Sequence, residues 1–98
     1  MLRKEPVKGK KEMKVTFIIQ DREDLGKVSV AGDFNDWETG VHRLVRRPNG
    51  TRSVAVVLPK GNVFRYRYFS DTIGWFNDEA ADGYEPNEFG TENCLVVT

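Results

Sequence analysis

Few residues in this sequence could perform covalent chemistry, and those few are isolated. The single histidine, His42, and the single cysteine, Cys94, each lie in a run typical of an ordinary β-strand, with no obvious nucleophile or base beside them. A catalytic thiol or hydroxyl needs such a partner within hydrogen-bonding reach. We therefore expect Cys94 to be a small buried side chain rather than a nucleophile.

Acidic residues offer a second possible chemistry. A glycoside hydrolase needs a pair of carboxylates, and four aspartates could in principle supply one: Asp33, Asp36, Asp71 and Asp78. Aspartates beside Gly and Asn more often form turns. The segment from Asp78 to Gly83 lacks the ligand pattern of a Ca²⁺ loop, and one cysteine cannot build a disulfide or a cysteine-based zinc site. We expect no enzyme, no metal and no cofactor.

Two tryptophans in polar loops remain as candidates. Trp37 closes the segment Gly-Asp-Phe-Asn-Asp-Trp, and Trp75 lies between Gly74 and Phe76. Such a residue is often a plug over the end of a core. Alternatively, its flat apolar face can stack on the C–H face of a sugar ring while neighbouring polar groups bond the hydroxyls. The residues alone leave both interpretations open.

The elements that must position these residues are short strands. Apolar residues alternate with others around Val15–Ile19, Val54–Leu58 and Phe64–Tyr68, and turn signals such as Pro-Asn-Gly recur about every ten residues. Further strands are predicted over Lys27–Ala31, His42–Arg47 and Cys94–Thr98. This pattern predicts an all-β fold, an antiparallel β-sandwich or small barrel. Tyr66 and Tyr68 should face opposite to Arg65 and Arg67.

The length and the charge distribution limit the number of domains and indicate how the chain is organised. The 98 residues suffice for one domain, and their aromatic content argues against disorder. Residues 1–12 are basic and poor in apolar side chains, which predicts a flexible tail before a domain over 13–98. The formal net charge is zero, but residues 39–70 hold seven basic and no acidic residues, while 71–98 hold seven acidic and no basic ones. We expect these two segments to pair loosely across a surface.

Four blocks, in order, are similar to a known family. Val28–Trp37 resembles the opening motif of family-48 carbohydrate-binding modules, the isoamylase N-terminal-type (early set E) domains. The glycogen-binding domain of the AMP-activated protein kinase β subunit is of the same type. Leu58–Tyr68, Asp71–Trp75 and Asn87–Asn93 resemble the family's later motifs. The resemblance covers residues 13–98 and implies an immunoglobulin-like antiparallel β-sandwich of about seven short strands.

The resemblance also implies a function and a site. It implies a non-catalytic module that binds α-1,4-glucan such as glycogen, starch or maltodextrin. We expect this module to stand alone, because no barrel or kinase-binding segment follows Thr98. The implied roles are stacking for Trp37 and Trp75, hydrogen bonding for Arg67, Thr91 and Asn93, and insertion beside the glucan for Phe89. The turn from Asp71 to Trp75 has one residue more than the family's Asp-Gly-x-Trp and lacks its Gly, so the sequence leaves the position of Trp75 open.

Two other functions are compatible with parts of the sequence. The fold could serve as a structural or protein-interaction domain that accompanies a glucan-metabolising enzyme and no longer binds sugar. Arginines interleaved with aromatic residues on Phe64–Tyr68 could bind a single-stranded nucleic acid, but alternation separates the two kinds of side chain. The acidic last segment would also repel a polyanion. We expect no nucleic-acid partner, no membrane partner and, without a signal peptide or long apolar run, a cytoplasmic location.

Overall fold

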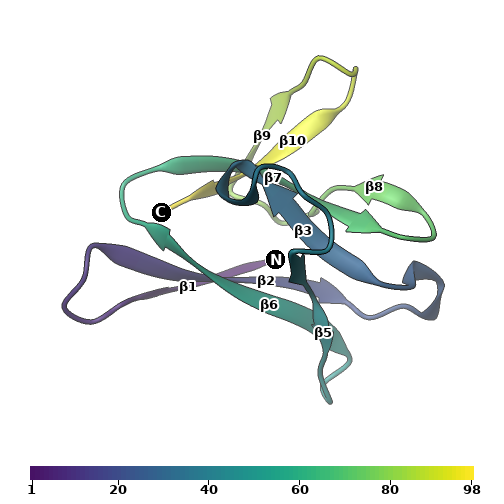
Figure 1. Cartoon of the computed structure of the whole chain (residues 1–98), viewed down its shortest axis with the longest axis horizontal. Coiled ribbons are helices and arrows are strands. Elements are labelled where there is room, and N and C mark those ends of the chain that lie inside the picture. Colours follow the sequence, from purple (N-terminus) through teal and green to yellow (C-terminus); the bar gives the residue numbers. More distant parts are fainter.

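Two antiparallel sheets make up the computed structural model of this chain, which describes all residues 1–98 (Figure 1). The first sheet has the strand order β1-β2-β6-β5, and the second has the order β4-β3-β7-β10-β9, with β8 paired to β7. The strands and the two single-turn 3₁₀ helices are β1 (Leu2–Pro6), β2 (Glu12–Gln20), η1 (Glu23–Leu25), β3 (Val28–Gly32), η2 (Asp33–Asn35), β4 (His42–Arg43), β5 (Val45–Arg46), β6 (Thr51–Pro59), β7 (Val63–Ser70), β8 (Gly74–Phe76), β9 (Gly83–Pro86) and β10 (Glu92–Val97).

This order is that of an immunoglobulin-like sandwich, as predicted. The first sheet corresponds to strands A-B-E-D of that fold, and β4-β3-β7-β10 corresponds to C′-C-F-G. The seven strands A to G of the fold are therefore present, in agreement with the predicted number, although β1 takes the place of strand A where a tail was predicted; the other strands are the short edge strands β4, β8 and β9. No helix is long and apolar enough to cross a membrane.

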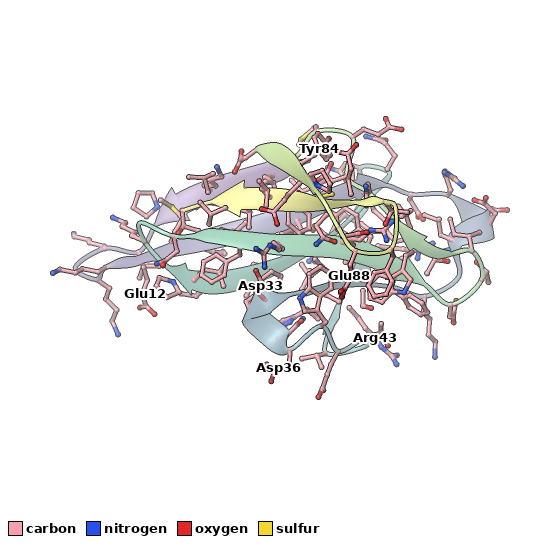
Figure 2. The ribbon with its side chains drawn as sticks, turned by 90° about the horizontal axis from the view of Figure 1, so that it is seen from above. Glu12, Asp33, Asp36, Arg43, Tyr84 and Glu88 are labelled. Carbon is pink, nitrogen blue, oxygen red and sulfur yellow. The ribbon has the colours of Figure 1, made fainter.

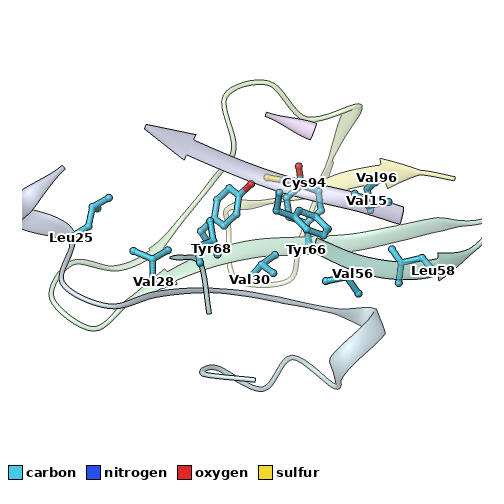
Figure 3. Close-up of a cluster of buried hydrophobic side chains, with 12 residues drawn as sticks. Val15, Leu25, Val28, Val30, Val56, Leu58, Tyr66, Tyr68, Cys94 and Val96 are labelled. Atoms are coloured by element: carbon cyan, nitrogen blue, oxygen red, sulfur yellow. The ribbon is translucent and has the colours of Figure 1, made fainter. Parts of the chain in front are cut away.

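The core lies between the sheets and follows the predicted alternation. Val15 and Phe17 of β2 are fully buried, and so are Tyr66 and Tyr68 of β7. Figure 3 shows the two tyrosines among aliphatic side chains from both sheets, with Cys94 beside them. Cys94 is buried as predicted, and burial raises the pKa of its thiol to about 11. The thiol is therefore protonated at neutral pH.

The tyrosine hydroxyls end on a buried carboxylate. Both Tyr66 and Tyr68 donate to Oδ2 of Asp78, at 2.9 and 3.2 Å, and the Ala80 N–H and the Met1 amino group donate to Oδ1. Burial by itself would raise the pKa of Asp78, but the amino group and these hydrogen bonds leave it lowered. Asp78 thus ties the middle of the core to the chain's first residue.

The predicted tail over residues 1–12 is wrong. Residues 2–6 form β1, which pairs in register with β2, and β2 itself begins at Glu12. Leu2 lies opposite Phe17 and packs against the core, and Lys4 Nζ lies 2.5 Å from the Asp82 carboxylate. The single core-packing side chain of this segment, Leu2, was too weak a sequence signal. Strand pairing and two charged contacts, Lys4 with Asp82 and the Met1 amino group with Asp78, order the segment.

The predicted strand over His42–Arg47 is in fact two strands. β4 pairs with β3 in one sheet, and β5 pairs with β6 in the other. Between them Leu44 turns inward, where it is 7% exposed, and its N–H donates to the Val28 carbonyl. The chain therefore crosses from sheet to sheet at Leu44, because this buried side chain holds the crossing point in the core.

The expected pairing of the basic and acidic segments is wrong for all but one pair. Arg65 and Glu85 form the single ion pair between them, at 2.8 Å. Arg46 and Arg52 instead pair with Asp21, and the acidic segment binds the amino terminus and Lys4. The Arg52 side chain is 4% exposed and also donates to the carbonyls of Arg22 and Gly26, so it closes one end of the sandwich.

Candidate functional site

The outer face of the second sheet carries the candidate site. Since Tyr66 and Tyr68 point into the core, the intervening residues of β7, Arg65, Arg67 and Phe69, point outward, as predicted from alternation. Neighbouring strands add Trp75 opposite Phe69, Ala31 opposite Arg67, and Glu85 opposite Asn93. Loops at the ends of β3 and β9 then cover parts of this face.

The two tryptophans meet on this face. Their ring centroids lie 6.3 Å apart with the planes tilted by 59°, and the Trp75 ring also packs edge-on against Phe69 at 5.0 Å. Trp75 is 42% exposed, whereas Trp37 is partly buried. The longer turn from Asp71 to Trp75 is accommodated as a three-residue hairpin loop that Gly74 closes with a φ of +83°. It places Trp75 against Trp37 despite the extra residue.

A strained loop holds Trp37 in place. Asp36 and Trp37 both have left-handed backbone conformations, with φ of 56° and 59°, which costs on the order of 1 kcal/mol or more for a bulky residue. The Trp37 N–H donates to the Gly32 carbonyl, and its indole N–H donates to Asp33. Asp33 in turn accepts the backbone N–H of Arg65, so the loop is anchored to β7.

Gly32 is needed for this anchoring. A Cβ at this position would lie 2.3 Å from the carbonyl oxygen of Arg65 and 2.8 Å from the Phe34 ring. Only a residue without a side chain therefore lets the loop approach β7 so closely. The Asp33 carboxylate then serves as a positioning group for the loop, in agreement with its interpretation as a turn-former.

Two shallow grooves lie next to each other on this face, and Trp37 lines the first of them. The first, about 420 Å³, is lined by Trp37, Phe89 and Asn93 together with Asp33 and the Arg65–Glu85 ion pair. The labelled Asp33 and Glu88, which both line it, lie near each other in Figure 2. The second, about 600 Å³, is lined by Arg67 and Thr91. The grooves share Pro86 and Asn87.

The structure therefore brings together five of the six predicted site residues along these grooves, and it adds Trp75 through its contact with Trp37. Phe89 lies at the tip of the β9–β10 hairpin, which projects from the molecule in Figure 1, and is 81% exposed. Thr91 lies in the turn just before β10 and Asn93 lies in β10, and Arg67 lies on β7, the strand that pairs with β10.

Two asparagines that the sequence did not point out organise the polar groups. Asn77 accepts from Arg67 Nε at 2.6 Å and donates to the Glu92 carbonyl. Asn87 bonds both the Thr91 hydroxyl and the Asn93 amide oxygen. Arg67 and Asn93 keep their remaining N–H groups free of protein partners, so these donors are open to a ligand. Asn87 begins the motif block quoted above, which is the one signal that could have identified it.

Comparison with known proteins adds no family assignment. No model of a known protein family matches the chain, and no match was found among curated proteins. The structure also brings no three His, Cys, Asp or Glu side chains together as they would gather around a metal ion. The chemistry that the site offers is therefore aromatic stacking beside hydrogen-bond donors and acceptors on an open surface.

Proposed function

We propose that the outer face of the second sheet binds α-1,4-glucan and that the protein is a non-catalytic binding module. The observation that carries the proposal is the pair of tilted tryptophans beside free N–H donors on one open face. Sugars are strongly hydrated, so a binder needs apolar faces for the C–H groups and polar partners for the hydroxyls. The four motif blocks in the sequence support the same ligand.

Each residue would have a distinct role. The Trp37 and Trp75 rings, tilted by 59°, offer two planes to consecutive units of a curved chain, and α-1,4-linkage curves a glucan. Arg67 and Asn93 would donate to hydroxyls, and the Thr91 hydroxyl stands next to them. Phe89 at the hairpin tip would contact the side of the glucan that faces away from the tryptophans. Such a ligand, glycogen or maltodextrin, is in keeping with a cytoplasmic location.

The test is a titration of the ¹⁵N-labelled protein with maltoheptaose, followed by NMR through the two indole N–H signals. We expect saturable shifts in both signals with a dissociation constant between micromolar and millimolar, about −8 to −4 kcal/mol. A β-1,4-linked glucan of equal length is the matched control, since it offers the same hydroxyls on a straight chain. Unchanged signals with both sugars in the folded protein would refute the proposal.

A variant separates the site from the fold. The double substitution Trp37→Ala and Trp75→Ala removes both planes from the surface and leaves the residues of the core cluster untouched. Maltoheptaose binding should be abolished while cooperative urea unfolding persists. Binding at the original affinity would show that another surface holds the glucan.

The other sheet favours a second candidate, a protein-interaction domain beside a glucan-metabolising enzyme. Its outer face carries Val45 and Val57, which are each about half exposed; Ala55 lies next to Val57 along β6, and Ile18 lies on β2 opposite Ser53. A complex with such an enzyme that survives added maltodextrin, and that Val57→Lys disrupts, would support this function. A complex released by maltodextrin would instead mean that glucan bridges the two proteins.

A further inference from the structure

A row of outward-facing side chains runs from the tryptophans to a cation. The strand register places Trp75 of β8 opposite Phe69 of β7, Phe69 opposite Ser29 of β3, and Ser29 opposite Arg43 of β4. Directly opposed residues of antiparallel strands point to the same side of the sheet. Arg43, labelled in Figure 2, therefore ends the row that Trp75 begins.

The Arg43 side chain and Phe69 line the same small groove. The Arg43 guanidinium packs over Gly40, where an added Cβ would lie 3.7 and 3.8 Å from two of its nitrogens. The Gly40 N–H donates to the Ser29 hydroxyl at 3.0 Å, which fixes this loop over β3. The groove has a volume of about 160 Å³ and is lined by Lys27, Arg43, Gly40 and Phe69.

Two cations in this groove lack partners. Lys27 and Arg43 make no ion pair and no side-chain hydrogen bond within the protein, whereas Arg46, Arg52 and Arg65 are all paired. Both also line the neighbouring groove of about 490 Å³. One carboxylate, Asp71, lines both grooves as well, and it accepts the Lys27 backbone N–H at 2.9 Å. The two free cations thus leave an excess of one positive charge.

We propose that the groove between Lys27 and Arg43 binds a phosphate monoester on a glucose unit, adjacent to the Trp75 platform. This inference rests on the proposed glucan-binding function and names a ligand class for it. A phosphate monoester is mostly dianionic at neutral pH. Arg matches phosphate with two parallel N–H donors, and Lys adds a compact charge. A phosphorylated polysaccharide and a free sugar phosphate share this chemistry.

The experiment compares four ligands by calorimetry: maltoheptaose, monophosphorylated maltoheptaose, glucose 6-phosphate and inorganic phosphate. The phosphorylated oligosaccharide should bind about tenfold more tightly than maltoheptaose, the gain expected of one charge-assisted hydrogen bond at a surface. The gain should shrink as salt is raised. The double variant Lys27→Gln and Arg43→Gln should lose it and keep its affinity for maltoheptaose, because neither residue lines the grooves beside Trp37.

A matched control removes two other charges. Lys8 and Lys60 lie in turns at the opposite end of the strands and form no ion pair, so Lys8→Gln with Lys60→Gln should keep the tenfold gain. Equal affinities for the two oligosaccharides, or a gain that survives in the Lys27 and Arg43 variant, would overturn the inference while the glucan proposal stands.

Glucose 6-phosphate and inorganic phosphate, the remaining two ligands, identify the source of the phosphate. Binding of glucose 6-phosphate that depends on Lys27 and Arg43 would assign the groove to a free sugar phosphate, and binding of the phosphorylated oligosaccharide alone would assign it to a polysaccharide. Inorganic phosphate that binds as tightly as either would overturn recognition of a sugar ester. Binding of none of the four ligands would overturn both this inference and the glucan proposal.

Discussion

Truncation of Trp75 gives the most direct measure of the proposed platform. An indole can bury up to about 250 Å², and Trp75 is 42% exposed, so about 100 Å² is open to a ligand. A sugar ring covers one of its two faces, and about 50 Å² at ~25 cal/mol per Å² stabilises the complex by about 1.3 kcal/mol. Trp75→Ala should therefore weaken maltoheptaose binding by about tenfold.

The assay is isothermal titration calorimetry on Trp75→Ala and on a neighbour of similar exposure. Ile73 is 48% exposed in the preceding loop and lines neither groove, so Ile73→Ala should leave the dissociation constant unchanged. Trp75→Phe keeps a flat ring and should retain most of the affinity. Urea unfolding of all three variants checks that the fold persists, as expected for side chains on an edge strand and its loop.

Two results would contradict this reasoning. If Trp75→Ala binds maltoheptaose as the unaltered protein does, the exposed indole is no platform. If Ile73→Ala weakens binding to the same extent, the loop is disturbed as a whole and the loss says nothing about stacking.

Three further predictions concern the fold that supports the site. The Thr16 hydroxyl is buried without a hydrogen-bond partner, so Thr16→Val should stabilise the protein by about 1 kcal/mol, seen as a melting point raised by about 4–8 °C; a lower melting point would contradict this. Gly32→Ala forces a Cβ against the Arg65 carbonyl and should cost about 2 kcal/mol or more in urea unfolding, whereas a loss below measurement error would show that the loop can shift freely. Because the folded protein lowers the pKa of Asp78 below its ordinary 3.8, this carboxylate contributes stability above that pH that is lost as the pH falls through its folded pKa. Asp78→Asn should lower stability at pH 7 by about 3 kcal/mol and flatten the acid limb of the stability curve; an unchanged acid limb would assign it to other carboxylates.

Alternation and turn residues sufficed to predict the fold class, because they depend only on neighbouring residues. Val15 with Phe17, and Tyr66 with Tyr68, follow the period of two and are all buried. The crossing of the chain between the sheets at Leu44 and the pairing of residues 2–6 with β2 could not be predicted this way. Both depend on a single apolar side chain that meets the core through tertiary contacts, and one residue creates no periodicity.

The arrangement of the candidate site was only partly predictable. Trp37, Arg67 and Asn93 were found as residue types in motif blocks, and the structure places them around neighbouring grooves. Two asparagines hold the polar side chains by hydrogen bonds. Asn87 bonds Thr91 and Asn93 within its own hairpin, whereas Asn77 joins Arg67 of β7 to Glu92 of β10, a tertiary contact that sequence spacing does not describe. Tertiary structure likewise brings Lys27 and Arg43, sixteen positions apart in the chain, to one groove, because β4 folds back on β3.

The crossing of the chain from one sheet to the other at Leu44 has a consequence for self-association of the protein. It divides one long strand into β4 and β5, each two residues long, so β5 pairs only with Arg52 and Ser53 and leaves the rest of the nine-residue β6 without a strand partner on that side. On the other side, β1 carries Arg3, Lys4 and Pro6, and β9 ends at Pro86. Short, charged or proline-bearing edges resist pairing with the strands of another chain. Strand pairing between copies is therefore disfavoured at β1 and β9, and the stretch of β6 beyond β5 is the edge left open to it.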